Sequence, residues 1–304
     1  MSHYLVNQLI HVMWSTQNLQ YHIHKSLKND LNAYVTALVK SKNGRVLATG
    51  GSPDHIHLLI VLPPEISLST LLGHVKAYSS KWIKSRENVD PKFSWQEGYL
   101  AISTQEDKLN SICQYIKEDE NRHQTKNYRD EIITILNLQG IKFNKDYLLT
   151  TSFSKVYVHL IWSTHNRTPC LEKNIRQNLY TQMTSRITNS KGIVHEIGGI
   201  EDHVHVLMEI PKNIALSDFT REIKTAASHW LKAQSKKFQQ FEWQAGYGGF
   251  TVSHSNVETV KKYIQNQEEH HREHTNNPEW ENFFMDRISI RDKTGNLAVP
   301  SGLD

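Results

Sequence analysis

Two pairs of histidines stand two residues apart in apolar segments: His55 with His57, and His203 with His205. In a β-strand, residues i and i+2 point to the same face, with Cα atoms about 6.6 Å apart. Two imidazoles on one face can bind a single divalent ion. A lone pair of this kind is more often two hydrogen-bonded histidines, but here apolar residues fill the alternate positions and the pattern occurs twice. The pairs therefore predict two metal sites, each of which needs a further ligand.

A predicted helix in each half offers that further ligand. Tyr115 stands four residues before Asp119, and Tyr263 stands four residues before Gln267. Residues four apart share one face of a helix, so each helix presents a phenol and a side-chain oxygen together. An isolated tyrosine in such a helix is usually a core residue. The oxygen ligand and the histidine pairs favour a nucleophile beside a metal ion instead.

The chain is an internal duplication. It aligns with itself at a shift of 148 residues, without a gap, from about residue 11 to residue 123, so that HVMWSTQN matches HLIWSTHN and FSWQEGY matches FEWQAGY. Solenoid repeats are only about 20 to 50 residues long, so a repeat of this length is a whole domain. We expect one domain over residues 1–148 and a second over 149–304, with the boundary between Asn127 and Thr151.

The hydrophobic pattern of each copy predicts the order β-α-β-β-α-β-α. In the first copy the expected strands and helices span residues 4–14, 26–40, 45–49, 55–62, 67–84, 99–103 and 108–123. The first six elements match the ferredoxin-like split βαβ arrangement, in which helices cover one face of an antiparallel sheet. The predicted fold class is α+β, with two ferredoxin-like domains.

Composition narrows the class of protein. Lys and Arg outnumber Asp and Glu by 35 to 31, which permits a polyanionic partner without requiring one. Cys113 and Cys170 lack a CxxC spacing, which argues against a disulfide framework and against a cysteine zinc site. The sequence has no leader-like start and no run of about 18 apolar residues, so we expect a cytoplasmic protein without a membrane partner.

Several segments resemble one known family. HVMWST, GGSPDHIHLLIVLP, LLGHVKAYSSKWIK, WQEGY and YIKEDENRH are similar to the IS200/IS605-type tyrosine (Y1) transposases, which are HUH nucleases and include the REP-associated tyrosine transposases. The resemblance covers almost all of both copies. It implies that the four paired histidines and Gln267 bind Mg²⁺ or Mn²⁺, and that Tyr115 and Tyr263 are nucleophiles. Asp119 departs from the family's glutamine, but a carboxylate remains a good ligand for these ions.

The resemblance also implies an activity and an assembly. The family cleaves and rejoins single-stranded, hairpin-bearing DNA through a 5′-phosphotyrosine, and the tyrosine helix of one subunit typically completes the histidine site of its partner. We therefore expect a monomeric pseudo-dimer with two non-equivalent, swapped sites. Tyr263 and Gln267 would serve the first histidine pair, and Tyr115 and Asp119 would serve the second. Assembly of each site within its own half stays open.

Other repeated residues carry weaker predictions. Lys76 and Lys224 could bind phosphates, although such lysines usually lie on a solvated helix face. Trp95 and Trp243 could stack on bases, although core packing is commoner for tryptophan. His11 and His159 lie on the first strand of each copy, where buried, hydrogen-bonded histidines are expected.

Two alternative functions remain. A domesticated nucleic-acid-binding protein that has lost catalysis is compatible with the divergence of the copies and with Asp119. A two-histidine RNA phosphoesterase is disfavoured, because that class carries His-x-Thr or His-x-Ser, and His57 and His205 occupy the Thr/Ser position.

Overall fold

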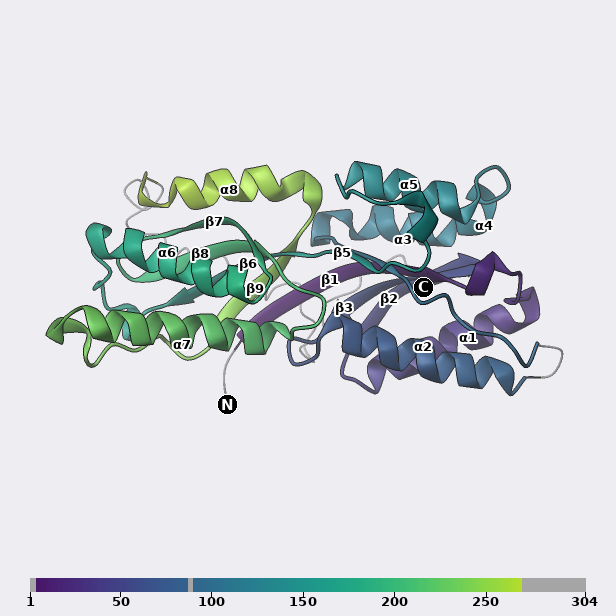
Figure 1. Ribbon diagram of the computed structural model, residues 1–304, viewed down its shortest axis with the longest axis horizontal. Coiled ribbons are helices and arrows are strands. Elements are labelled where there is room, and N and C mark those ends of the chain that lie inside the picture. The colour runs from purple at the N-terminus through teal and green to yellow at the C-terminus, as the bar shows by residue number, and fades with distance from the viewer. Residues whose placement is uncertain (1–3, 87–89, 270–304) are drawn as a thin grey trace.

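The computed structural model describes residues 4–86 and 90–269 (Figure 1). The elements of the first half are β1 (Tyr4–Ser15), α1 (Lys25–Lys40), β2 (Arg45–Ser52), β3 (His55–Leu62), α2 (Leu68–Lys84), β4 (Leu100–Ser103), α3 (Leu109–Lys117), α4 (Asp119–Arg122) and α5 (Tyr128–Leu138). Those of the second half are β5 (Phe153–Lys155), β6 (Tyr157–Ser163), α6 (Lys173–Asn189), β7 (Ile193–Gly199), β8 (His203–Glu209), α7 (Leu216–Gln234), β9 (Tyr247–Val252) and α8 (Val257–Gln265). Short 3-10 turns lie at Gln17–Leu19, Glu106–Lys108, Lys145–Tyr147, His165–Arg167, Lys236–Phe238 and His254–Asn256.

The strands form one continuous sheet. Its main order is β2-β3-β1-β9-β6-β8-β7, and β4 lies between β1 and β5. Each half therefore has the predicted ferredoxin-like order, β2-β3-β1-β4 in the first and β7-β8-β6-β9 in the second. The α+β class is confirmed. The sequence did not indicate the parallel pairing between the halves, in which β1 begins beside β9 and β5 lies beside β4.

Matched contacts join the two halves at the middle of the sheet. The backbone N–H of Leu9 donates to Thr251 Oγ1 at 2.9 Å, and that of Tyr157 donates to Ser103 Oγ at 3.0 Å. The members of the two bonds correspond under the 148-residue shift, so the halves are related by an approximate two-fold axis. The tandem two-domain arrangement is confirmed, whereas the pseudo-dimer and the exact boundary between residues 148 and 149 stay predictions.

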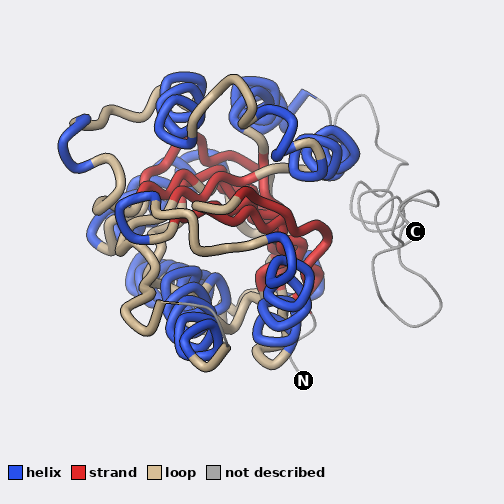
Figure 2. Tube along the Cα trace, turned by 90° about the vertical axis from the view of Figure 1, so that its right-hand side faces the viewer, coloured by secondary structure: helices blue, strands red, loops and turns tan. Residues whose placement is uncertain are grey.

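Helices cover both faces of the sheet, as Figures 1 and 2 show. The main core lies against α1, α2, α6 and α7 and takes in Ile56, Leu58 and Ile60 of β3. The other residues of this strand face α3, which packs Cys113 and Ile116 against Leu59. Because side chains alternate along a strand, the same register points the histidines toward the helix that carries Tyr115.

Two glycines set how closely this helix approaches. A Cβ atom on Gly50 would lie 2.6 Å from the backbone oxygen of Ile116, and one on Gly198 would lie 2.6 Å from that of Ile264. No such contact is tolerable, so only glycine lets α3 and α8 lie directly on β2 and β7. The next residue, Gly51, has a φ of +141°, which favours glycine for a second reason.

The helix expected over residues 108–123 is interrupted. Glu118 leaves the helical region with φ −86° and ψ 9°, and Asn266 does the same after α8 with φ −92° and ψ 13°. In both halves the break comes directly before the proposed oxygen ligand. Asp119 and Gln267 are each only 1% exposed, so the break accompanies their burial toward the sheet.

Within residues 4–86 and 90–269, no helix is both long and apolar enough to span a bilayer.

Candidate metal and nucleophile sites

The first histidine pair is oriented by hydrogen bonds at its Nδ1 atoms. His55 Nδ1 lies 2.6 Å from Asp54 Oδ1, and His57 Nδ1 lies 3.1 Å from His11 Nε2. Burial, followed by the nearby His57, lowers the pKa of His11 to about 3, so the His11 ring is neutral. Metal-binding histidines are commonly held in this way, with one ring nitrogen bonded to a protein group and the other left to the ion.

The second pair repeats the arrangement. His203 Nδ1 lies 2.7 Å from Asp202 Oδ1, and His205 Nδ1 lies 2.9 Å from His159 Nε2. His159 is thus a buried, hydrogen-bonded histidine, as expected from the sequence. It also fixes the ring of the histidine that we expect to bind metal, which gives it a positioning role.

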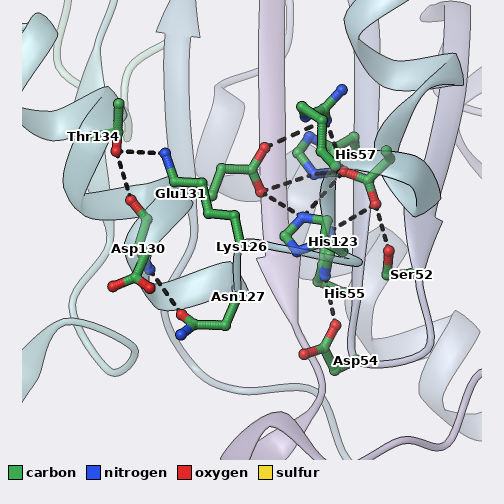
Figure 3. Close-up of polar contacts among 12 residues, drawn as sticks. Ser52, Asp54, His55, His57, His123, Lys126, Asn127, Asp130, Glu131 and Thr134 are labelled. Carbon is green, nitrogen blue, oxygen red and sulfur yellow. Dashed lines mark hydrogen bonds and ion pairs between the residues drawn. The ribbon is translucent and has the colours of Figure 1, made fainter.

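Asp119 completes the first site, whose residues Ser52, His55 and His57 are labelled in Figure 3. Its carboxylate oxygens lie 3.0 Å from His55 Nε2 and 3.3 Å from His57 Nε2. These ring nitrogens are buried and, within the described residues, neither contact has hydrogen-bond geometry. Ser52 Oγ donates to the carboxylate at 2.7 Å and holds it in place. The two imidazole nitrogens and the carboxylate thus converge on one point without hydrogen bonds between them. Such a set of ligand atoms is suited to binding a divalent cation.

Gln267 takes the same position in the second site. Its Oε1 lies 3.4 Å from His203 Nε2, and the rings of His205 and Tyr263 have centroids 5.7 Å apart. The second site therefore presents a neutral carboxamide oxygen where the first presents a carboxylate.

Each site is assembled within its own half. Asp119 lies on the first histidine pair and Gln267 on the second, so the expected swapped arrangement is incorrect for this structure. The physical reason is the short connection before each tyrosine helix. Residues 104–108, which end in the 3-10 turn Glu106–Lys108, separate β4 from α3. Residues 253–256, which end in the 3-10 turn His254–Asn256, separate β9 from α8. The helix then packs on the adjacent strands of the same half.

Tyr115 lies beside its own histidine pair. Its ring centroid is 6.2 Å from that of His57, and its hydroxyl donates a hydrogen bond to Glu131. The Arg122 guanidinium lies 3.6 Å above the phenol ring. Burial and the negative charge of Glu131 raise the pKa of Tyr115, so the phenol is protonated at neutral pH in this arrangement.

Two further residues of the first site were missed from the sequence. Glu131 Oε2 lies 3.1 Å from His123 Nε2 and 3.6 Å from His57 Nε2. His123 could have been found, because it continues the four-residue spacing of Tyr115 and Asp119. Glu131 comes from α5, and no local spacing marks it.

Charges in the first site nearly balance. Burial acts to raise the pKa of Asp119 and of Glu131, but contacts with His123 and other histidines outweigh it, and both values lie well below the usual range. Burial acts to lower the pKa of His123, but the two carboxylates outweigh it and raise the value to about 10. Arg122 adds a second positive charge, 2.8 Å from Asp119.

The structure gives no support to the expected DNA contacts of Lys76 and Trp95. Lys76 Nζ donates to the backbone oxygens of residues 96, 97 and 98 at 2.6, 2.8 and 3.1 Å, which occupies its three N–H groups. Burial lowers the pKa of Lys76 to about 8. Trp95 is 8% exposed, and its indole donates to Ser79 at 2.9 Å. Both residues support the WQ-x-GY loop from inside the fold.

The second copy shows the same internal role. Lys224 Nζ donates to the backbone oxygens of Gln244 and Gly246 at 2.8 and 2.7 Å, and Trp243 donates to the backbone oxygen of Lys224 at 3.1 Å. The recurrence of this lysine in both copies predicts a phosphate contact. Tertiary packing instead directs the ammonium group to carbonyl oxygens.

Comparison with known proteins identifies the family of this chain. The model of the family described as IS200-like transposases matches residues 4–119 and 152–267, most of the chain and both copies. The chain belongs to this family. Over 126 residues it is 29% identical to the transposase for insertion sequence element IS200 of Salmonella typhimurium, which spans 36% of this chain and 80% of the relative. The IS200 transposase of Salmonella typhi gives the same values.

Two solved structures also match. A protein of Deinococcus radiodurans assigned as a transposase is 23% identical, with a TM-score of 0.31, and covers 37% of this chain and 91% of its own. A REP-associated tyrosine transposase bound to a REP hairpin is 16% identical, with a TM-score of 0.31, and covers 40% of this chain and 68% of its own.

Proposed function

We propose that this chain is a metal-dependent transposase that cleaves and rejoins single-stranded, hairpin-bearing DNA through tyrosine nucleophiles. One observation carries the proposal. In each half a tyrosine ring lies about 6 Å from the second histidine of the His-x-His pair, and an oxygen ligand faces the first. Membership of the IS200-like family supports the reaction class.

The proposed step is a transesterification. The phenol oxygen of Tyr115 or Tyr263 forms a bond to the scissile phosphorus as the bond from phosphorus to the 3′ oxygen breaks. The tyrosine is then joined to the 5′ phosphate, and the departing strand takes up a proton as a free 3′-hydroxyl. Because one ester replaces another, the 3′-hydroxyl of a second strand can reverse the step without ATP.

The protein's own residues would prepare this step. His55, His57 and Asp119 would hold Mg²⁺ or Mn²⁺ in the first site, with the paired histidines and Gln267 as their counterparts in the second. Such an ion, when bound, polarises the scissile phosphate. Asp54 and His11 keep the first two rings turned toward that position. The Glu131 carboxylate accepts a hydrogen bond from the Tyr115 hydroxyl and would thereby orient it.

The duplication suggests how the chain works as a unit. The matched contacts at the centre of the sheet support a dimer-like arrangement of the two halves within one chain. We propose that the protein acts as a monomer with two non-equivalent sites, on DNA in the cytoplasm.

Adduct formation tests the proposed function. Wild type and the Tyr115→Phe, Tyr263→Phe and double variants would be incubated with hairpin-bearing single-stranded DNA and Mn²⁺, then run on a denaturing gel. We expect a covalent protein–DNA band in wild type, a reduced band in at least one single variant, and none in the double variant or with EDTA. Tyr21→Phe is the matched control, because Tyr21 is 72% exposed.

Two other results of this experiment would contradict the proposed function. If wild type binds the hairpin but forms no more adduct than the double variant, the protein is a non-catalytic nucleic-acid-binding member of the family. Free DNA ends without an adduct would indicate a hydrolase.

A further inference from the structure

We propose that Glu131 is a fourth metal ligand of the first site. This inference deepens the proposed function and rests on it only in taking the site to hold a divalent cation. Ligand atoms of His55, His57, Asp119 and Glu131 all lie within 4.8 Å of one another, and all four residues are buried. Glu131 lies beyond residues 4–119, the first segment that the family model matches.

Packing of α5 fixes the position of Glu131. The ring of Tyr128 stacks on that of His55 with centroids 4.4 Å apart, and Ile132 and Leu136 lie in a buried cluster on this face of the sheet. Asn127 caps the helix by accepting a hydrogen bond from the backbone of Asp130 at 2.9 Å. The helix is therefore anchored on both sides of Glu131, and the carboxylate is preorganised rather than free to turn to solvent.

The two oxygens of this carboxylate have different neighbours. Oε1 accepts the hydrogen bond from Tyr115, while Oε2 faces His57 Nε2 and His123 Nε2. A carboxylate can keep one oxygen on a phenol while the other binds a cation. Glu131 would thus link the nucleophile directly to the metal ion, and a cation could bind without loss of the contact to Tyr115.

Charge supports a ligand role. A second anionic oxygen strengthens the binding of a hard cation, because affinity at such sites rises with ligand charge. Arg122 and His123 partly neutralise the two carboxylates, which makes their close approach tolerable without an ion. The position 148 residues later, Glu279, lies outside the described residues, so the inference concerns the first site alone.

Metal binding by the full-length chain tests the inference. Substitution of His203 and His205 by Ala in all samples would remove the second site, and Mn²⁺ binding would be titrated by electron paramagnetic resonance. In this background we expect Glu131→Gln to weaken Mn²⁺ binding about tenfold or more, a size typical of groups that support a metal site. Asp130→Asn is the matched control, because Asp130 is the preceding residue, is exposed, and undergoes the same carboxylate-to-amide change. It should leave binding within about twofold.

Equal Mn²⁺ affinity of Glu131→Gln and Asp130→Asn would overturn the inference. If Glu131→Gln does not fold, a second experiment uses the chain that carries only the two histidine substitutions. Its glutamate carboxylates are labelled with ¹³C, and infrared difference spectra are recorded with and without Mg²⁺. A Mg²⁺-induced shift of a glutamate band supports ligation, and an unshifted spectrum contradicts it. Loss of Mn²⁺ binding in Glu131→Gln without any DNA adduct in wild type would sustain the ligand and reject the proposed function, so the two can fail separately.

Discussion

The two candidate metal sites of this chain have the same arrangement of histidines, and different oxygen-bearing side chains lie beside those histidines. In both, a turn carboxylate and a histidine of the neighbouring strand hold the His-x-His rings, with nearly equal distances. Opposite the rings, the first site has Asp119 and Glu131, whereas the second has Gln267. Strand register and the glycine-containing turn before each His-x-His pair fix the positions of the rings. The rings therefore have little freedom to move. Asp119 and Gln267 each follow the end of the tyrosine helix, where a carboxylate and a carboxamide of different length both fit, whereas Glu131 comes from α5.

The strongest test of this comparison is the glycine beneath each tyrosine helix. We expect Gly50→Ala to slow adduct formation at Tyr115 about a hundredfold, because displacement of a reacting group by about 1 Å can cost that much. Tyr263 should be unaffected, and Gly198→Ala should give the reverse. Peptide mass spectrometry of the adducts would assign each tyrosine.

The outcome also decides which half supplies the helix. If Gly50→Ala instead reduced the adduct at Tyr263, the swapped assembly would operate in solution. Gly73→Ala is the control, because a Cβ atom at this exposed position of α2 meets nothing within 4 Å.

The second test concerns the histidines that hold the metal-facing rings. We expect His11→Ala to weaken Mn²⁺ binding at the first site, and His159→Ala at the second, each by about 10- to 100-fold. Isothermal titration should then resolve one weakened site and one normal site in each variant. Substitution of the exposed His24 by Ala should change neither. An unchanged first site in His11→Ala would show that this hydrogen bond does not orient His57.

The smallest expected effect is on the two lysines of the WQ-x-GY loops. Lys76→Met should lower the free energy of unfolding by about 1–3 kcal/mol, since the variant loses charged hydrogen bonds to backbone carbonyls. Lys224→Met should cost somewhat less, because Lys224 donates to two carbonyls rather than three. Urea unfolding measures both, with the exposed Lys81→Met as control. If Lys76→Met kept its stability but reduced the salt dependence of DNA binding by about one ion, Lys76 would be a phosphate contact after all.

The features that could be predicted from the sequence are those that depend on local periodicity. The strand expected over residues 55–62 has those bounds in the structure, and its alternation correctly placed His55 and His57 on one face and the core residues on the other. The four-residue spacing correctly brought Tyr115 and Asp119 to one site, although the helix between them is broken at Glu118.

The sequence by itself determined the duplication, the ferredoxin-like order of each half, and the pairing of a His-x-His strand with a tyrosine helix in each copy. These features follow from periods of two and 3.6 residues and from a repeat that needs no gap. Only the tertiary structure decided that each tyrosine helix serves its own half, that the two sheets join into one, and that Glu131 enters the first site. Those contacts join segments that local spacing does not relate, and they depend on how closely one backbone can approach another, as at Gly50.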